Sequence, residues 1–334
     1  MSAPRLDINL DKISHNARML VEDLGDRGIA VTGVTKAALG SLDIAKAMLR
    51  AGMSGLGDSR IENIEAMRQQ RISAPIMLIR SPMLSQVERV VRNADISFNT
   101  ELSVVRRLSA AAEEAERSHG IMLMVELGDL REGILPEDLV SAAREVMRLP
   151  NLEPTGIGTN LACPSGMAPD ADNMGALSAL ADRVEAELDV KLALISGGNS
   201  ANLDWALSNS ATGRINHLRL GEAIFLGCEP LHREPVDGLH TDAITLVAEV
   251  IESETKPSLP WGTLAETAFG GDVISTDSGA MARAILAVGE QDLDPDGLLA
   301  PEGLTILGAS GDHASIHSLD MGLVSNSGGS SSMN

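Results

Sequence analysis

The chain has 334 residues, of which 44% are hydrophobic and 22% are charged, a balance typical of a soluble globular protein. Its formal net charge of −21 at pH 7 argues against a nucleic-acid partner, because affinity for phosphate backbones comes largely from Lys and Arg. Aromatic residues make up 1% of the chain and Tyr is absent, which also removes the stacking surfaces used by proteins that bind single-stranded nucleic acids.

Cysteine content and the N-terminal sequence indicate the compartment. Two cysteines, Cys163 and Cys228, are too few for a disulfide framework and point to a reducing environment. The N-terminus carries Arg5, Asp7 and Asp11 where a signal peptide needs an apolar core. No uncharged apolar run approaches the roughly 20 residues needed to cross a bilayer. We therefore expect a cytoplasmic protein without a membrane-bound part.

The predicted elements begin with a short strand at Leu6–Leu10 and a helix that runs to about Leu24. Apolar runs then alternate with helical stretches as far as about Leu231. The eight runs are the one that ends at Lys36, Ser54–Gly57, Pro75–Arg80, Asp95–Phe98, Ile121–Leu127, Pro154–Gly158, Lys191–Ile195 and Asn216–Leu220. Their number and spacing predict an α/β fold, a closed parallel (β/α)8 barrel of the TIM type. A doubly wound open sheet is the alternative, but its Gly-rich dinucleotide turn after the first strand is missing.

A change of pattern beyond Pro230 predicts a second domain. Strands are predicted at Asp242–Ile251, Arg283–Val288, Thr305–Leu307 and Ala314–His317, with little helical periodicity between them. We expect the barrel over residues 12–230 and a smaller β-rich domain over residues 231–324, which the N-terminal strand within residues 1–11 joins. Residues 325–334 are rich in Ser and Gly and are expected to be disordered.

Polar side chains at the predicted strand ends indicate where the site lies. In a barrel of this kind the C-terminal ends of the strands meet at one mouth. The residues placed there are Lys36, Arg60, Arg80, Asn99, Arg131, Asn160, the Ser196–Ser200 loop and Arg219. Amines, guanidiniums, amides and hydroxyls suit an anionic cofactor better than a divalent metal. No metal site is predicted.

Lys36 and the Ser196–Ser200 loop each allow two interpretations. In the first interpretation of Lys36, the aliphatic part of its side chain packs against the protein and its ammonium group reaches water. In the second, its amine forms a Schiff base with a carbonyl compound. The loop Ser196-Gly197-Gly198-Asn199-Ser200 can be interpreted as a flexible turn. Alternatively, its backbone N–H groups and hydroxyls bind a phosphate at the start of a helix. Phosphate sites in barrels cluster after the seventh and eighth strands, where this loop lies.

Eight segments in one order resemble a known family, the pyridoxal-phosphate enzymes of the alanine racemase fold, and most closely its ornithine racemase branch. The resemblance runs from about Leu6 to His313. The segments are Val34-Thr35-Lys36, Asp58-Ser59-Arg60-Ile61-Glu62-Asn63, Val125-Glu126-Leu127-Gly128-Asp129-Leu130-Arg131-Glu132-Gly133, Gly156-Ile157-Gly158-Thr159-Asn160-Leu161, Ser196-Gly197-Gly198-Asn199-Ser200, Leu218-Arg219-Leu220-Gly221-Glu222, Lys256-Pro257-Ser258-Leu259-Pro260 and Gly308-Ala309-Ser310-Gly311-Asp312-His313.

The resemblance implies a role for each matching position. Lys36 is expected to hold the cofactor and to move the α-proton of the substrate. Arg219 is expected to face the pyridine nitrogen, and Arg131 to lie beside the phenolic oxygen and near the substrate carboxylate. The other cofactor-binding residues implied are Asn160, Ser196, Gly198, Asn199, Ser200 and the backbone of Gly221 and Glu222. Asn160 stands where alanine racemases have His and the ornithine branch has Asn.

The second catalytic group is where this chain departs from the family. Alanine racemases use a Tyr from the partner subunit, whereas the matching position here is Phe269, which has no titratable proton. Asp312 is the first candidate to replace it, followed by His313 and Cys163. Cys163 is equally well interpreted as a small buried apolar residue. His313 and His317 can likewise be interpreted as residues of a turn and a strand that have no catalytic role.

The resulting hypothesis is a pyridoxal-phosphate-dependent amino-acid racemase, an isomerase that interconverts L- and D-forms of ornithine or another basic amino acid. A homodimer would bring Asp312 of one chain to the Lys36 mouth of the other. Glu222 or Asp312 would recognise the distal ammonium group of the substrate. Two alternatives stay open: a non-catalytic pyridoxal-phosphate carrier, and a D-hydroxyamino-acid aldolase that needs a metal cluster not found near Thr305–His317.

Overall fold

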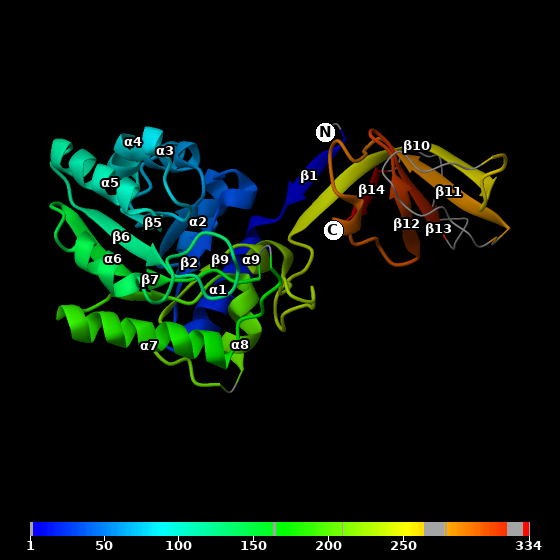
Figure 1. Cartoon of the computed structure of the whole chain (residues 1–334). Helices are drawn as coiled ribbons and strands as arrows, with labels where there is room; N and C mark the ends of the chain where they lie inside the picture. The colour runs from blue at the N-terminus through cyan, green and yellow to red at the C-terminus, as the bar shows by residue number, and fades with distance from the viewer. Residues whose placement is uncertain are drawn as a thin grey trace. The chain divides into compact units, whose positions relative to one another are not determined.

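The structure, a computed structural model, describes residues 3–162, 165–208, 210–263, 277, 279–318 and 330–333. The chain divides into two compact units (Figure 1). One unit comprises Leu10–Thr241, and the other comprises Met1–Asn9 together with Asp242–Asn334. No helix among the described residues is long and apolar enough to cross a membrane.

The larger unit is a closed parallel barrel, which confirms the predicted fold class. Its strands are β2 (Ala30–Val34), β3 (Gly55–Asp58), β4 (Ile76–Leu78), β5 (Ile96–Asn99), β6 (His119–Met124), β7 (Leu152–Gly158), β8 (Leu194–Ser196) and β9 (His217–Leu220). Each strand pairs in parallel with the next, and β9 pairs with β2 to close the ring. The C-terminal ends of these strands therefore all lie at the same end of the barrel, which is its mouth.

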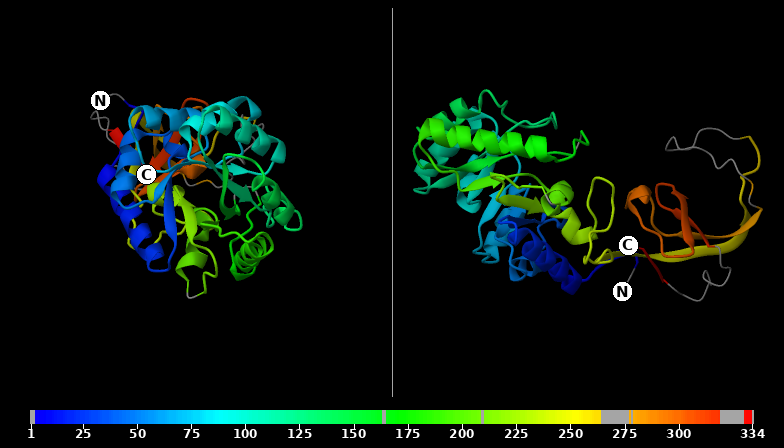
Figure 2. Two further views of the ribbon diagram at one scale, coloured as in Figure 1. Left: turned by 90° about the vertical axis from the view of Figure 1, so that its left-hand side faces the viewer. Right: turned by 90° about the horizontal axis from the view of Figure 1, so that it is seen from below.

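Helices surround these strands (Figure 2, left). They are α1 (Leu10–Gly25), α2 (Leu42–Arg50), α3 (Ile61–Gln69), α4 (Val87–Asn93), α5 (Leu102–Glu114), α6 (Leu139–Val146), α7 (Ala171–Leu188), α8 (Leu203–Leu207) and α9 (Glu222–Leu226). In α1 the spacing of Ile13, Ala17, Leu20 and Leu24 gives one apolar face, and all four are fully buried. Such faces cover the outside of the barrel and leave its mouth to polar residues.

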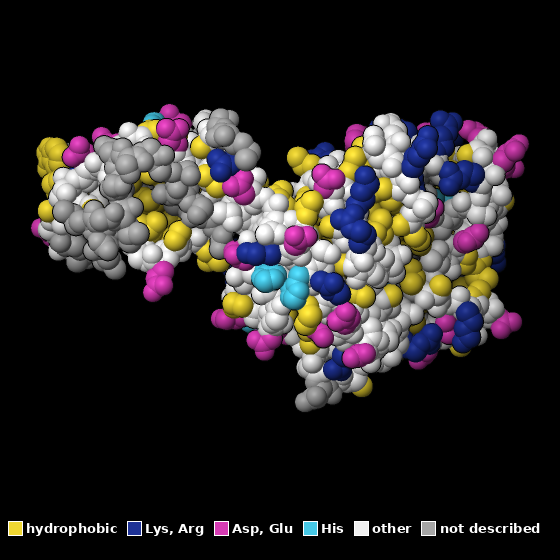
Figure 3. Space-filling view, turned by 180° about the vertical axis from the view of Figure 1, so that it is seen from behind, with side chains coloured by type: hydrophobic (Ala, Val, Ile, Leu, Met, Phe, Trp, Pro, Cys, Tyr) yellow, Lys and Arg dark blue, Asp and Glu magenta, His cyan; other side chains and the backbone are white. Residues whose placement is uncertain are grey.

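The helix surfaces carry acidic and basic side chains side by side (Figure 3). Between α3 and α4, for example, Arg89 contacts Glu62 at 2.9 Å and Glu65 at 2.5 Å. These side chains are partly exposed to solvent, so each pair stabilises the fold by about 1 kcal/mol or less. The stability of the barrel therefore depends mainly on its apolar packing.

Two kinds of side chain fill the inside of the barrel. Met77, Phe98, Met122 and Met124 form an apolar cluster on β4, β5 and β6. On the other side of the barrel, β2, β8 and β9 contribute buried polar residues, namely Thr32, Ser196, His217 and Arg219. The neighbouring strand β7 ends in Gly158, where a Cβ atom would lie only 3.1 Å from Ser196 Cβ. Glycine at this position therefore gives the polar group the room it needs.

The smaller unit is an antiparallel sheet with the strand order β1-β10-β11-β13-β12. Its strands are β1 (Arg5–Ile8), β10 (Ile244–Pro257), β11 (Ala280–Leu286), β12 (Leu304–Ala309), β13 (Ala314–Ser318) and β14 (Ser330–Met333). Ala248, Ala284, Leu286, Val288 and Ile316 are among the residues of its core.

The end of the chain corrects one expectation. Residues 325–334 were expected to be disordered, yet Ser330–Met333 forms β14 and pairs with Leu246–Glu249 of β10. The pairing joins backbone groups of β10 to backbone groups of β14. Composition alone cannot reveal such a free strand edge far along the chain. Residues 319–329 and 334 lie outside the described part.

Substitution of a buried strand residue should test the packing of the barrel. Leu56 on β3 is fully buried, whereas Leu39 is 77% exposed. We expect Leu56→Ala to lower the free energy of unfolding by about 2–5 kcal/mol, because it removes apolar contacts and leaves a cavity. The matched control Leu39→Ala should change it by less than about 0.5 kcal/mol. Urea unfolding followed by circular dichroism measures both values, and equal effects would contradict the assigned core.

A buried histidine should make stability depend on pH. His119 begins β6, contacts Ser97 Oγ at 2.8 Å through Nε2, and has its pKa lowered from 6.5 to about 4 by burial. The folded state keeps this ring neutral, while the unfolded state takes up a proton below about pH 6.5. The stabilising contribution is therefore present above pH 6.5 and is lost as the pH falls toward 4.

Replacement of His119 isolates this contribution. The free energy of unfolding of the unmodified protein should fall by about 2 kcal/mol more than that of His119→Gln between pH 8 and pH 4.5. Measurements at pH 8, where the ring is neutral in both states, serve as the control. Parallel pH profiles of the two proteins would show that the burial of His119 does not govern its titration.

Candidate active site

A cleft of about 730 Å³ opens at the C-terminal ends of the barrel strands. The structure brings together there most of the residues that the sequence analysis singled out. Those that line the cleft are Lys36, Arg131, Asn160, Asn199, Ser200, Arg219, Gly221 and Glu222. Arg80, which the sequence also places at this mouth, lines the cleft, as do Ser59, Ser81 and Glu132, which were not singled out as site residues. The lining is rich in cations, and its carboxylates are Glu132 and Glu222.

Lys36 lies directly after β2 and begins a short 3-10 turn at Lys36–Ala38. The residue before it is fixed, because the buried Thr35 donates a hydrogen bond of 2.7 Å to Asp58 Oδ2. The other Asp58 oxygen accepts from the Arg60 N–H at 2.9 Å and from Asn63 Nδ2 at 3.0 Å. The backbone next to Lys36 is therefore anchored to the end of β3, while the Lys36 side chain is exposed in the cleft.

The loop after β8 forms a tight turn that presents Ser200. Gly198 has a φ of +150°, and a Cβ atom there would overlap Asn202 Oδ1. That same oxygen accepts from the Asn199 N–H at 3.0 Å, and Asn199 Oδ1 accepts from the Ala201 N–H at 2.9 Å. Only glycine allows this geometry without strain.

The phosphate-binding expectation rests on how two chain segments meet. Ser200 Oγ accepts from the N–H of Ala223 at 3.3 Å, so the loop after β8 lies against the first turn of α9. Gly221 precedes α9, and a Cβ atom there would lie 3.0 Å from the Val34 carbonyl oxygen. Backbone N–H groups and a hydroxyl that converge in this way suit an anion.

Arg219 is a buried cation in the floor of the cleft, with 3% of its surface exposed. It donates to the carbonyl oxygen of Thr159 at 2.9 Å, to Ser196 Oγ and to Asn160 Oδ1. Its guanidinium carbon also lies 5.1 Å from the centre of the Phe98 ring. Burial, together with repulsion from Arg131, lowers the pKa of Arg219 to about 9, so it stays charged at neutral pH.

Arg219 therefore has neutral acceptors and an aromatic face around it. None of the ion pairs of the described residues includes it. A buried cation of this kind favours a ligand that carries lone pairs or negative charge. An anionic aromatic aldehyde fits this cleft, because Lys36 offers an amine, Arg219 offers N–H donors and the Ser200 region offers an anion site.

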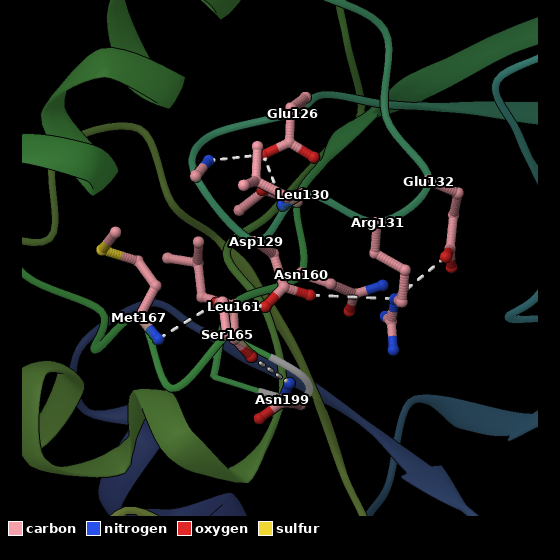
Figure 4. A network of polar contacts seen from close by, with 12 residues as sticks. Glu126, Asp129, Leu130, Arg131, Glu132, Asn160, Leu161, Ser165, Met167 and Asn199 are labelled. Atoms are coloured by element: carbon pink, nitrogen blue, oxygen red, sulfur yellow. Dashed lines mark hydrogen bonds and ion pairs between the residues drawn. The ribbon is translucent and has the colours of Figure 1, made fainter.

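Arg131 lies on a loop that other side chains hold in place (Figure 4). Glu126 Oε1 accepts from the N–H groups of Gly128 at 2.5 Å and Leu130 at 3.1 Å. The buried Asp129 accepts from Ser165 Oγ at 2.7 Å. These contacts fix the loop on both sides of Arg131.

The Arg131 side chain itself has acidic neighbours on the same loop. Arg131 Nε lies 2.9 Å from Glu132 Oε2 and 3.7 Å from Asp129 Oδ2. The guanidinium thus has acidic partners and still lines the cleft. The sequence motif around Arg131 therefore serves to orient its guanidinium group.

The candidates for a second catalytic group are Asp312, His313 and Cys163. Asp312 and His313 belong to the smaller unit, are exposed, and contact each other at 2.6 Å through Oδ1 and Nδ1. His317 contacts the carbonyl oxygen of Ala282 on the neighbouring strand at 3.0 Å. Cys163 and Phe269 lie outside the described residues. Among the side chains that the structure describes, no group of three His, Cys, Asp or Glu is arranged to hold a metal.

Sequence comparison relates the whole chain to amino-acid racemases. The ornithine racemase of Acetoanaerobium sticklandii is 37% identical over 313 residues, which cover 93% of this chain and 88% of that protein. The lysine racemase of Thermotoga maritima is 37% identical over 324 residues, covering 96% and 90%.

Structural comparison supports the same fold at lower identity. An alanine racemase from Streptomyces lavendulae has a TM-score of 0.75 at 20% identity, covering 100% of this chain and 88% of that one. A D-threonine aldolase from Filomicrobium marinum reaches 0.78 at 13%, covering 100% and 87%. The family model for the alanine racemase N-terminal domain matches residues 8–229, which include all the barrel strands. The chain therefore belongs to the alanine racemase N-terminal domain family.

Proposed function

We infer that the protein is a pyridoxal-phosphate-dependent racemase of a basic amino acid. The observation that carries this conclusion is 37% identity, over nearly the full chain, to an ornithine racemase and a lysine racemase. Members of this family are pyridoxal-phosphate enzymes. The cation-rich cleft and its Ser200 region have the chemistry that such a cofactor requires.

Lys36 and the Ser200 region are proposed to divide the work of binding the cofactor. Ser200 and the backbone N–H groups at Gly221 and Glu222 would hold the phosphate, and the Lys36 amine would hold the aldehyde carbon. A bound cofactor would withdraw electrons from the amino acid and so make its α-proton acidic. The Lys36 amine would then take that proton from one face of the α-carbon, and a group on the opposite face would deliver the proton that completes the inversion.

Arg219 is proposed to control the outcome of the reaction. Its guanidinium keeps its proton at neutral pH and would donate a hydrogen bond to the cofactor's ring nitrogen. With such a donor, the ring would stay unprotonated and would withdraw electrons less strongly, which would favour return of a proton to the α-carbon over transamination. Arg131, oriented by Glu132 and Asp129, binds the substrate carboxylate.

Inversion at the α-carbon requires a second group on the face opposite Lys36. We propose that Asp312 of the partner subunit supplies it in a homodimer, with His313 and Cys163 as alternatives. A large apolar side chain next to Arg131 supports a second copy at this mouth: Leu130 is 86% exposed. We also propose a cytoplasmic location, which the free thiol of Cys228 supports.

Replacement of the proposed anchor tests cofactor binding. The purified protein with pyridoxal phosphate should show the visible absorption band of a lysine-bound cofactor, and Lys36→Ala should lose it, because no other amine occupies that position. Lys46→Ala, an exposed lysine on α2, is the matched control and should keep the band. A band that persists in Lys36→Ala after removal of free cofactor would refute the assignment.

A substrate panel tests the reaction and its specificity. We expect racemisation of L-ornithine or L-lysine, with kcat/KM at least about tenfold higher than for L-norvaline, which lacks the distal ammonium group. Glu222, whose carboxylate lines the cleft, is the proposed partner of that ammonium, so Glu222→Gln should reduce this preference. Chiral chromatography measures the products. Exchange of the α-proton in deuterated water with retention of configuration throughout the panel would instead favour the carrier alternative.

A further inference from the structure

A row of buried polar side chains lies beneath Arg219. Ser196 Oγ, which accepts from Arg219 Nη1, also contacts His217 Nδ1 at 2.8 Å. The other ring nitrogen, His217 Nε2, contacts Thr32 Oγ1 at 2.8 Å. Thr32 in turn lies 3.9 Å from Met77 Sδ across the barrel. Thr32, Ser196 and His217 are each at most 1% exposed.

Arg219 determines the direction of every hydrogen bond in this row. A guanidinium can only donate, so Ser196 Oγ accepts from it and directs its own hydrogen to His217 Nδ1. His217 must then carry its proton on Nε2 and donate it to Thr32 Oγ1, which leaves the Thr32 hydrogen for Met77 Sδ. If the proton were on Nδ1 instead, both Arg219 and His217 would donate to Ser196, and the Ser196 hydrogen would have no acceptor within the row.

The imidazole ring of His217 is also held in its neutral form. Burial, with a further contribution from the charge of Arg219, lowers the pKa of His217 to about 3. The groups that contact it from the neighbouring strands, Thr32 and Ser196, are uncharged. A second cation in this row would repel Arg219 at close range.

We propose that His217 is a positioning residue of the racemase, whose neutral ring with the proton on Nε2 fixes Ser196 as the acceptor that holds Arg219 under the cofactor. Arg219 has five N–H donors, of which Ser196, Thr159 and Asn160 take one each. Ser196 is the acceptor for Nη1, so together with Thr159 and Asn160, which accept from Nη2, it fixes the rotation of the guanidinium and the direction of the donors left for a ligand. The part of this inference that concerns the cofactor rests on the proposed function.

The first test needs neither cofactor nor activity. Long-range ¹H–¹⁵N correlation spectra of the full chain without cofactor, labelled on histidine, should show His217 in the form with the proton on Nε2 and without titration from pH 5.5 to 9. His217→Asn identifies its signals by their loss. A proton on Nδ1, or titration within this range, would overturn the proposal whether or not the protein is a racemase.

The second test uses the holoenzyme and a matched control. His217→Leu should still bind the cofactor through Lys36, but with a shifted absorption maximum and kcat lowered at least about tenfold at little changed KM. His217→Asn, which can present an acceptor to Ser196, should restore part of kcat. The control His119→Leu removes the other buried histidine that contacts a serine, and should leave band and kcat unchanged.

The outcomes separate the two proposals. Equal effects of His217→Leu and His119→Leu, or no rescue by His217→Asn, would mean that His217 serves only the stability of the barrel. Absence of a lysine-bound cofactor in the unmodified protein would refute the proposed function, while the tautomer in the cofactor-free chain would still decide the role of His217. If His217→Leu does not fold, the ¹H–¹⁵N spectrum of the cofactor-free chain and the kcat of His217→Asn still test the role of His217.

Discussion

The buried guanidinium of Arg219 is the constraint on which the floor of the site depends. Removal of a cation from water costs several kcal/mol unless polar partners compensate for it. In the part of the chain that the structure describes, those partners are neutral: a backbone carbonyl, a hydroxyl and an amide oxygen. They come from β8 and from the end of β7, whereas Arg219 is on β9. The arrangement therefore exists only when these strands are paired in one register.

The same constraint explains the composition of the barrel interior. Phe98 lies against the guanidinium and belongs to a methionine-rich cluster, which fills one side with polarisable apolar groups. Gly158 keeps the neighbouring position empty of side-chain atoms. Apolar filling on one side and hydrogen-bonded polar residues on the other thus hold the buried Arg219 cation in the floor of the cleft.

In the cleft above Arg219, neighbouring side chains hold the backbone that carries Lys36 and the backbone that carries Arg131. Thr35 and Asp58 fix the base of Lys36, and Glu126 and Asp129 fix the loop that carries Arg131. The functional groups themselves stay accessible while the backbone beneath them is held by hydrogen bonds. Such an arrangement suits a reaction in which one amine must both hold a cofactor and move a proton, because small errors in position are costly in rate.

Local sequence determined the barrel and much of the cleft. Alternation of apolar runs and amphipathic helices predicts eight strands, and parallel strands place Lys36, Arg131, Asn160 and Arg219 at one mouth whatever the details of packing. The Gly198 loop is equally local, since its turn and caps involve residues within a few positions of one another. These features follow from short-range periodicity and turn chemistry.

Only the tertiary structure decided which residues meet inside the barrel. His217 and Thr32 are 185 positions apart and become neighbours because β9 pairs with β2 when the barrel closes. The pairing of Ser330–Met333 with β10 is likewise non-local. A sequence pattern indicates that a side chain is buried, but hydrogen-bond partners across a closed sheet depend on register and side-chain packing, which no local window contains.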